Sequence, residues 1–145
     1  MAYLDYSAVA TYVAQSNRST FSAFTVISLI WKESRFDPKA KAGSSTATGL
    51  MQMTKTALGE VNRVKKTAYN HADMTDPAKN IETGTTYLSI CLTRKGEESA
   101  ALDYYGTGKG YSTKITAAAA ALAALPSPVT SKAATTVLID KIGKQ

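Results

Sequence analysis

The sequence predicts a single all-α domain built around one buried central helix, and three observations favour this fold class. The chain has 145 residues, which is long enough to bury a core but short for two domains. Its composition is 44% hydrophobic and 19% charged, with many alanines, and this favours folded helical structure. Almost every segment between turn signals has helical spacing, and strands are hard to place. We therefore expect one domain over residues 1–145.

The first two helices are predicted from apolar spacing. A helix is expected over about residues 6–15, before the polar residues 16–19. A second helix is expected to start from a cap at Ser19 or Thr20 and to continue through the apolar positions between Phe21 and Trp31. Its density of apolar residues predicts deep burial, so it should be the central helix.

Pro38 limits the length of this central helix. Proline disfavours helical backbone at the preceding residue and lacks an N–H donor, so the helix should end near Arg35. Glu33 is therefore expected at its C-terminal end. The small and polar residues 38–49 predict a surface loop, and a further helix is expected over about residues 54–63.

The second half of the chain is predicted to be helical as well. Asp76 caps a helix with Pro77 in its first turn, and four apolar or small residues mark its buried face: Ile81, Gly84, Leu88 and Cys91. A short helix is expected over residues 97–105, followed by a glycine-rich turn at residues 106–110. Two more helices are expected over residues 112–125 and 131–142.

Charge and cysteine content exclude several kinds of partner. The net charge of +6 suits nucleic acid, but it equally suits an anionic bacterial wall, and the basic residues are scattered, so we expect no nucleic-acid partner. With Cys91 as the single cysteine and His71 as the single histidine, no internal disulfide and no metal site are expected. No cofactor is predicted, and the chain is expected to be a monomer.

Neither the N-terminus nor the apolar residues 115–125 predict a membrane segment. Residues 1–7 contain no basic stretch and no long apolar run, so they do not resemble a signal peptide. Residues 115–125 are far shorter than the roughly 20 residues of a spanning helix. If the chain acts outside the cytoplasm, delivery by phage lysis machinery, a virion or a secretion system is expected.

Glu33 is the candidate catalytic residue, because a glutamate among isoleucine and tryptophan neighbours usually has a partner or a function. On position alone, an exposed helix-end residue paired with Lys32 or Arg35 is the more common case. Its context favours catalysis: Glu33, Ser34 and Phe36 are followed by the run Gly49-Leu50-Met51-Gln52. A third block then follows: Asp76, Pro77, Asn80, Ile81, Gly84, Tyr87 and Leu88.

In order and spacing, these blocks resemble the catalytic domain of soluble lytic transglycosylases, relatives of goose-type lysozyme, over about residues 20–111. The resemblance implies a lysozyme-like fold, with residues 112–145 packing on it. It also implies substrate-binding roles for Gln52, the Met51 region and Tyr105. Two positions depart from the family pattern: Gly106 replaces the usual asparagine, and Ala42 replaces a frequent serine, for which Ser44 or Ser45 could substitute.

The resemblance further implies cleavage of the bond between N-acetylmuramic acid and N-acetylglucosamine in peptidoglycan, in the bacterial envelope. Glu33 would protonate the leaving oxygen and then deprotonate the C6 hydroxyl, giving a 1,6-anhydro product. Hydrolysis by two carboxylates would need a second acid, and neither Asp37, Asp76 nor Asp103 is a convincing candidate. A goose-type hydrolase and a non-catalytic wall-binding or virion module remain the alternatives.

Overall fold

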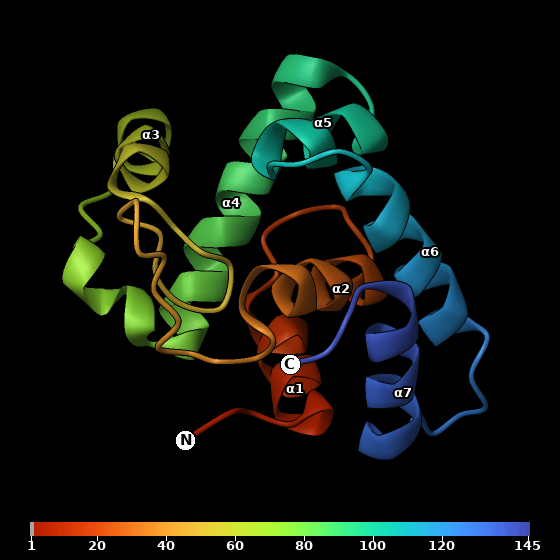
Figure 1. Ribbon diagram of the computed structural model, residues 1–145. Helices are drawn as coiled ribbons and strands as arrows, with labels where there is room; N and C mark the ends of the chain where they lie inside the picture. The colour runs from red at the N-terminus through yellow and green to blue at the C-terminus, as the bar shows by residue number, and fades with distance from the viewer. Residues whose placement is uncertain (1) are drawn as a thin grey trace.

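The structure is a computed structural model that describes residues 2–145. Met1 lies outside the described residues. It belongs to residues 1–7, the segment for which no signal peptide is expected. Seven α-helices and one 3-10 helix follow one another (Figure 1): α1 (Tyr6–Ser16), α2 (Ala23–Ser34), α3 (Lys55–Lys65), η1 (His71–Thr75), α4 (Pro77–Lys95), α5 (Glu98–Tyr105), α6 (Tyr111–Ala123) and α7 (Ser131–Lys141). Apart from two isolated β-bridges, residues 2–145 form no β-structure, which confirms the predicted all-α class.

Helix α2 crosses the centre of the molecule and packs against α1 and α6 (Figure 1). Six consecutive residues, from Val26 to Trp31, are buried, which confirms the predicted central helix. The predicted cap at Ser19 or Thr20 is wrong. Ser22 caps the helix by accepting from the Thr25 amide at 3.1 Å, whereas the Ser19 hydroxyl is held in a local turn by Asn17 at 2.6 Å.

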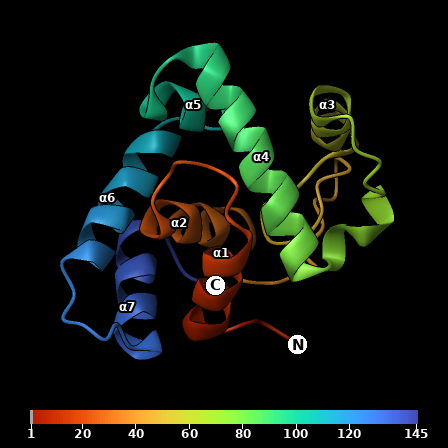
Figure 2. The same ribbon diagram turned by 180° about the vertical axis from the view of Figure 1, so that it is seen from behind.

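The longest helix, α4, lies at the back of the molecule (Figure 2). Asp76 caps it by accepting from the Lys79 amide at 2.9 Å, with Pro77 in the first turn, as predicted. Helices α1, α3 and α5 all pack against it.

Two groups of buried apolar side chains flank α4. The larger one contains residues from every α-helix except α3, including Leu122 of α6 and Leu138 of α7. The smaller one lies beneath α3 and η1: Met53, Ala57, Leu58, Val61, Met74 and Ile90. The sequence predicted neither η1 nor this second cluster. Among residues 2–145, no helix has both the length and the apolar character needed to cross a bilayer.

Candidate functional site

Glu33 lies in the last turn of α2 and lines an open cavity of about 480 Å³. The helix ends directly after it, because Arg35 adopts the left-handed conformation (φ 52°) and donates its amide to the Trp31 carbonyl at 2.9 Å. The other residues lining the cavity come from the 38–54 loop and from the end of α5: Ala42, Ser44, Ser45, Ala47, Gln52, Thr54, Tyr105, Gly106 and Thr107. Glu33 is thus the only carboxylate among these lining residues.

The hydroxyl of Tyr111 donates a hydrogen bond to Oε2 of Glu33. Burial raises the pKa of Glu33, and this effect exceeds the lowering by the Tyr111 hydrogen bond and by the charges of Lys32 and Arg35. Burial and the neighbouring carboxylate both raise the pKa of Tyr111, so this phenol keeps its proton and acts as the donor. Glu33 is therefore a partly desolvated acid with one fixed hydrogen-bond partner.

Sequence reasoning missed this contact, because the family resemblance implied a role for Tyr105 and none for Tyr111. Gly106 explains how Tyr111 is placed: a Cβ atom added there would lie 2.1 Å from the Tyr111 ring. Tyr111 itself begins α6, and the Asp103 carboxylate accepts from the next amide, that of Ser112, at 2.9 Å. The departure from the family pattern at position 106 thus makes room for the ring that contacts Glu33.

Gln52 is held in a tight turn at the edge of the cavity. Its backbone is left-handed (φ 52°), and its side-chain Nε2 donates to the carbonyls of Ala40 and Gly49, each at 3.0 Å. Gly49 is needed for the same turn, since its φ is 81° and an added Cβ would lie 2.1 Å from the Met74 carbonyl oxygen. Gln52 thus braces the loop and also presents polar atoms to the cavity.

Asn80 of α4 fastens this loop to the helix. Its side chain is fully buried and makes three hydrogen bonds: it donates to the carbonyls of Thr48 (2.9 Å) and Met74 (2.8 Å) and accepts from the Met51 amide (2.8 Å). All of its bonds go to the protein backbone, so its part of the sequence motif has an architectural role.

Of the two expected contact residues Met51 and Tyr105, only Tyr105 lines the cavity. The Met51 side chain is fully buried and packs on Gly84, where an added Cβ would lie 2.5 Å from its sulfur, so it does not line the cavity. The Tyr105 hydroxyl donates to the Met51 carbonyl at 2.6 Å, and burial together with the nearby Glu33 carboxylate raises the pKa of this phenol. Met51 is thus tied to the site only through its backbone carbonyl, which holds the Tyr105 hydroxyl.

The structure also shows where the serines and the remaining acidic residue named in the sequence analysis lie. Ser44 and Ser45 line the cavity beside Ala42, whereas Ser34 is buried and donates to the Ile30 carbonyl at 3.0 Å. Asp37 accepts from the Lys39 amide in the loop, away from the lining residues. No group of three or more potential metal ligands occurs in residues 2–145.

Comparisons with known proteins agree with this architecture. Residues 11–125 match the family described as the transglycosylase SLT domain. The comparison with curated proteins gives no match.

Solved structures of soluble lytic transglycosylases have a similar fold. The 70 kDa enzyme from Escherichia coli matches with a TM-score of 0.60 at 18% identity, over 95% of this chain and 22% of that one. An inactive glutamate-to-glutamine mutant of the enzyme Slt from Pseudomonas aeruginosa matches with a TM-score of 0.59 at 23% identity, over 96% and 21%. A complex of a 70 kDa enzyme with bulgecin A matches with a TM-score of 0.59 at 19% identity, over 92% and 21%.

The chain thus spans about a fifth of the length of these solved proteins, and they show its fold. The family match covers most of the sequence, from α1 to the end of α6. This chain therefore belongs to the transglycosylase SLT domain family.

Proposed function

We propose that this chain is a peptidoglycan lytic transglycosylase that cleaves the β-1,4 bond between N-acetylmuramic acid and N-acetylglucosamine, with Glu33 as its acid and base. One observation carries the proposal: Glu33 is a desolvated carboxylic acid, bonded to Tyr111, and the single carboxylate among the residues that line the cavity. Such a group has the properties required of a general acid near neutral pH.

The chemistry follows from the environment of Glu33. Burial keeps a fraction of the acid protonated, so it can donate its proton to the leaving glycosidic oxygen. The substrate's acetamido oxygen then stabilises the sugar cation. The Glu33 carboxylate, which has lost its proton in the first step, removes the proton from the C6 hydroxyl. That oxygen closes the 1,6-anhydro ring, so Glu33 ends protonated, as it began. A second carboxylate, which hydrolytic mechanisms employ, is not required.

Tyr111, which bonds Glu33, and several lining residues have supporting roles in this proposal. Tyr111 orients the Glu33 carboxylate and stabilises its charged form after proton transfer. Gln52, Ser44 and the ring of Tyr105 line the cavity and are proposed to contact the sugar chain. The printed description of the Pseudomonas aeruginosa relative, an inactive mutant with glutamine in place of glutamate, supports an essential glutamate in this fold.

Mass spectrometry of the products from purified peptidoglycan tests the proposal. Wild type and Glu98→Gln, which alters an exposed glutamate on α5, are expected to release muropeptides with 1,6-anhydro ends. Glu33→Gln is expected to release none. Reducing ends, heavier by one water or about 18 Da, would instead identify a hydrolase. Equal release by Glu33→Gln would remove Glu33 from the mechanism, and no release by the wild type would favour a binding module.

A further inference from the structure

A groove on the outer side of α4 has a chemistry different from that of the Glu33 cavity. It consists of two adjoining hollows of about 360 and 240 Å³, which share Lys65 and Ser89. From α4 they are lined by residues of one helix face: Glu82, Thr86, Ser89, Ile90, Thr93 and Arg94. Asn80 and Gly84, which contact the 48–51 loop, lie on the opposite face, since successive residues turn by about 100°. A ligand in this groove would therefore not compete for the cavity.

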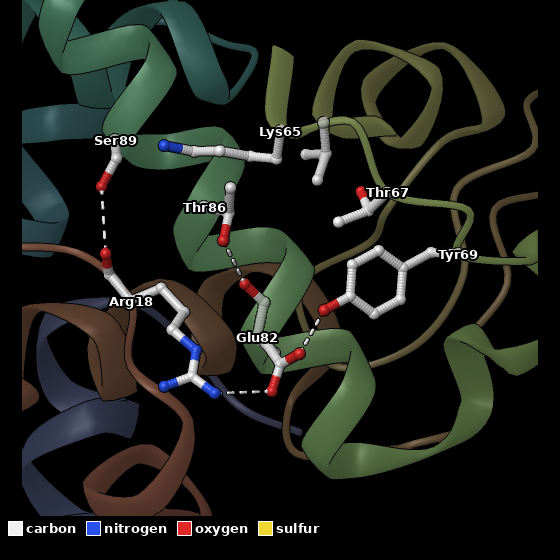
Figure 3. Close-up of a pocket in the computed structure, with 8 residues that line it drawn as sticks. Arg18, Lys65, Thr67, Tyr69, Glu82, Thr86 and Ser89 are labelled. Carbon is white, nitrogen blue, oxygen red and sulfur yellow. Dashed lines mark hydrogen bonds and ion pairs between the residues drawn. The ribbon is translucent and has the colours of Figure 1, made fainter. Parts of the chain in front are cut away.

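Three cations line this groove: Arg94, which is paired with Glu60, and the two basic residues Lys65 and Arg18. Lys65 is exposed at the end of α3, and its side chain makes no ion pair or hydrogen bond with any residue that the structure describes. Figure 3 shows it extended over α4 toward Ser89, while Arg18 approaches from the loop between α1 and α2. The Arg18 side chain is 55% exposed and bonds Glu82 through one nitrogen at 2.9 Å, so several of its five N–H donors remain available.

The one carboxylate at this end of the groove is already engaged. Glu82 accepts from the Tyr69 hydroxyl on one oxygen and from Arg18 on the other (Figure 3). The Tyr69 hydrogen bond, followed by Arg18, lowers the pKa of Glu82, so it stays charged and paired. Its charge therefore offsets that of Arg18, and the ammonium of Lys65 is left without a counter-ion.

The groove hydroxyls offer acceptors to a ligand. Three of them donate their own hydrogen to the protein: Thr86 to the Glu82 carbonyl (2.7 Å), Ser89 to the Arg18 carbonyl (3.4 Å) and Thr67 to Oδ1 of Asn62 (2.9 Å). A hydroxyl oxygen carries two lone pairs, so each of these oxygens can still accept a hydrogen bond. The groove thus combines cationic donors with hydroxyl acceptors.

We propose that this groove is a second, non-catalytic site that binds a segment of an anionic polymer rich in hydroxyl groups, such as an acidic glycan or a polyol phosphate. Lys65 and Arg18 would contact its carboxylate or phosphate groups, and the groove hydroxyls would accept from its hydroxyls. A DNA backbone offers phosphates but almost no free hydroxyl donors. It would therefore pair with the cations of the groove but leave the hydroxyl acceptors without a partner. The groove runs from Glu82 to Arg94, about 18 Å along α4, enough for several units of a chain.

Binding of defined polymers tests the site separately from catalysis. Titration calorimetry at low ionic strength would compare poly(glycerol phosphate), the carboxylate-bearing polygalacturonate, neutral dextran and a DNA duplex. Lys65→Glu is expected to weaken binding of at least one of the two anionic polyols about tenfold or more, because it replaces an attraction by a repulsion. Lys65→Arg keeps the charge and is expected to bind like the wild type. The two polyols show whether phosphate or carboxylate is preferred.

The matched control is Lys132→Glu, the same charge change at an exposed lysine of α7 that does not line the groove. Equal weakening by Lys65→Glu and Lys132→Glu would mean diffuse charge attraction, and it would overturn the site. The site would also be overturned if dextran or the DNA duplex bound as tightly as poly(glycerol phosphate) and polygalacturonate. It would be overturned as well if neither of these two anionic polymers bound. Release of anhydro muropeptides is expected to be unchanged in Lys65→Glu. A failure of the groove and a failure of the Glu33 mechanism are thereby distinguishable.

Discussion

At the scale of single residues, the site depends on how Glu33 is charged. Burial raises its pKa, whereas Tyr111, Lys32 and Arg35 favour the carboxylate and hold the pKa lower than burial alone would. A general acid that later acts as a base must be able to take both its protonated and its charged form near the working pH. The opposing influences on Glu33 meet that requirement without a second acid.

Tyr111→Phe tests the contribution of the hydrogen bond. Its loss is expected to raise the pKa of Glu33 further, because the bond favours the charged form. The step that needs protonated Glu33 is lost as pH rises through this pKa, so the alkaline limb of the kcat profile should move to higher pH. A hydrogen bond to a charged group contributes about 1.5–3 kcal/mol, so kcat at the optimum should fall about tenfold or more. Tyr104→Phe, at a 45% exposed tyrosine, should change neither. An unshifted limb in Tyr111→Phe would contradict the assigned contact.

Glu33→Gln is expected to stabilise the fold at alkaline pH. The folded-state pKa of Glu33 lies above its unfolded value, so the wild type loses stability as pH rises through the folded pKa. Glutamine does not titrate and escapes this loss. Thermal unfolding should therefore give a higher Tm for the variant at pH 8, with the gain shrinking toward pH 4; each 1 kcal/mol corresponds to about 2–4 °C. A gain independent of pH, or one shared by Glu98→Gln, would point to another cause.

At the scale of elements, the sequence predicted those helix bounds that local sequence signals determine. The bounds of α1, α3, α5, α6 and α7 and the start of α4 were predicted within about two residues, because caps such as Thr54 and Asp76 and the apolar spacing are local features. The cap of α2 was mispredicted because three candidate hydroxyls precede it and only the fold selects Ser22. The Tyr111–Glu33 contact joins residues 78 apart, and no local signal encodes it.

Two glycines in neighbouring helices should respond oppositely to alanine. Gly84 of α4 has the Met51 sulfur 2.5 Å from an added Cβ, so Gly84→Ala is expected to cost about 1–3 kcal/mol of folding free energy and to displace the loop that carries Gln52. Gly59 of α3 has no atom within 4 Å of an added Cβ, so Gly59→Ala should gain about 0.5–1 kcal/mol through helix propensity. Urea unfolding gives both values, and destabilisation by both variants would show that Met51 is not the cause.

At the scale of the whole molecule, both ends of the chain converge on the turn that follows Glu33. The Leu4 amide donates to the Phe36 carbonyl at 2.9 Å, and the Trp31 indole donates to the Gly143 carbonyl at 2.8 Å. Arg35 and Phe36 are consecutive non-glycine residues with positive φ (52° and 68°), a conformation that persists only when its surroundings impose it. Sequence reasoning predicted the end of the helix from Pro38, but not these contacts, of which those to the C-terminal segment join residues more than 100 apart.

Arg35 is central to this arrangement, and Arg35→Lys tests it. Its guanidinium donates to three carbonyls, those of Trp31, Lys32 and Lys144, each at 2.8 Å. Lysine keeps the charge but lacks the planar fork that reaches all three. We expect a loss of about 1–3 kcal/mol in unfolding free energy, measured in urea, and a lower kcat, because the last turn of α2 holds Glu33. Lys144→Ala is the matched control: the contact uses the Lys144 backbone carbonyl, so removing the exposed side chain should change neither quantity. If Arg35→Lys matches the wild type in both, the charge of Arg35 suffices and the clamp on the chain end does not position Glu33.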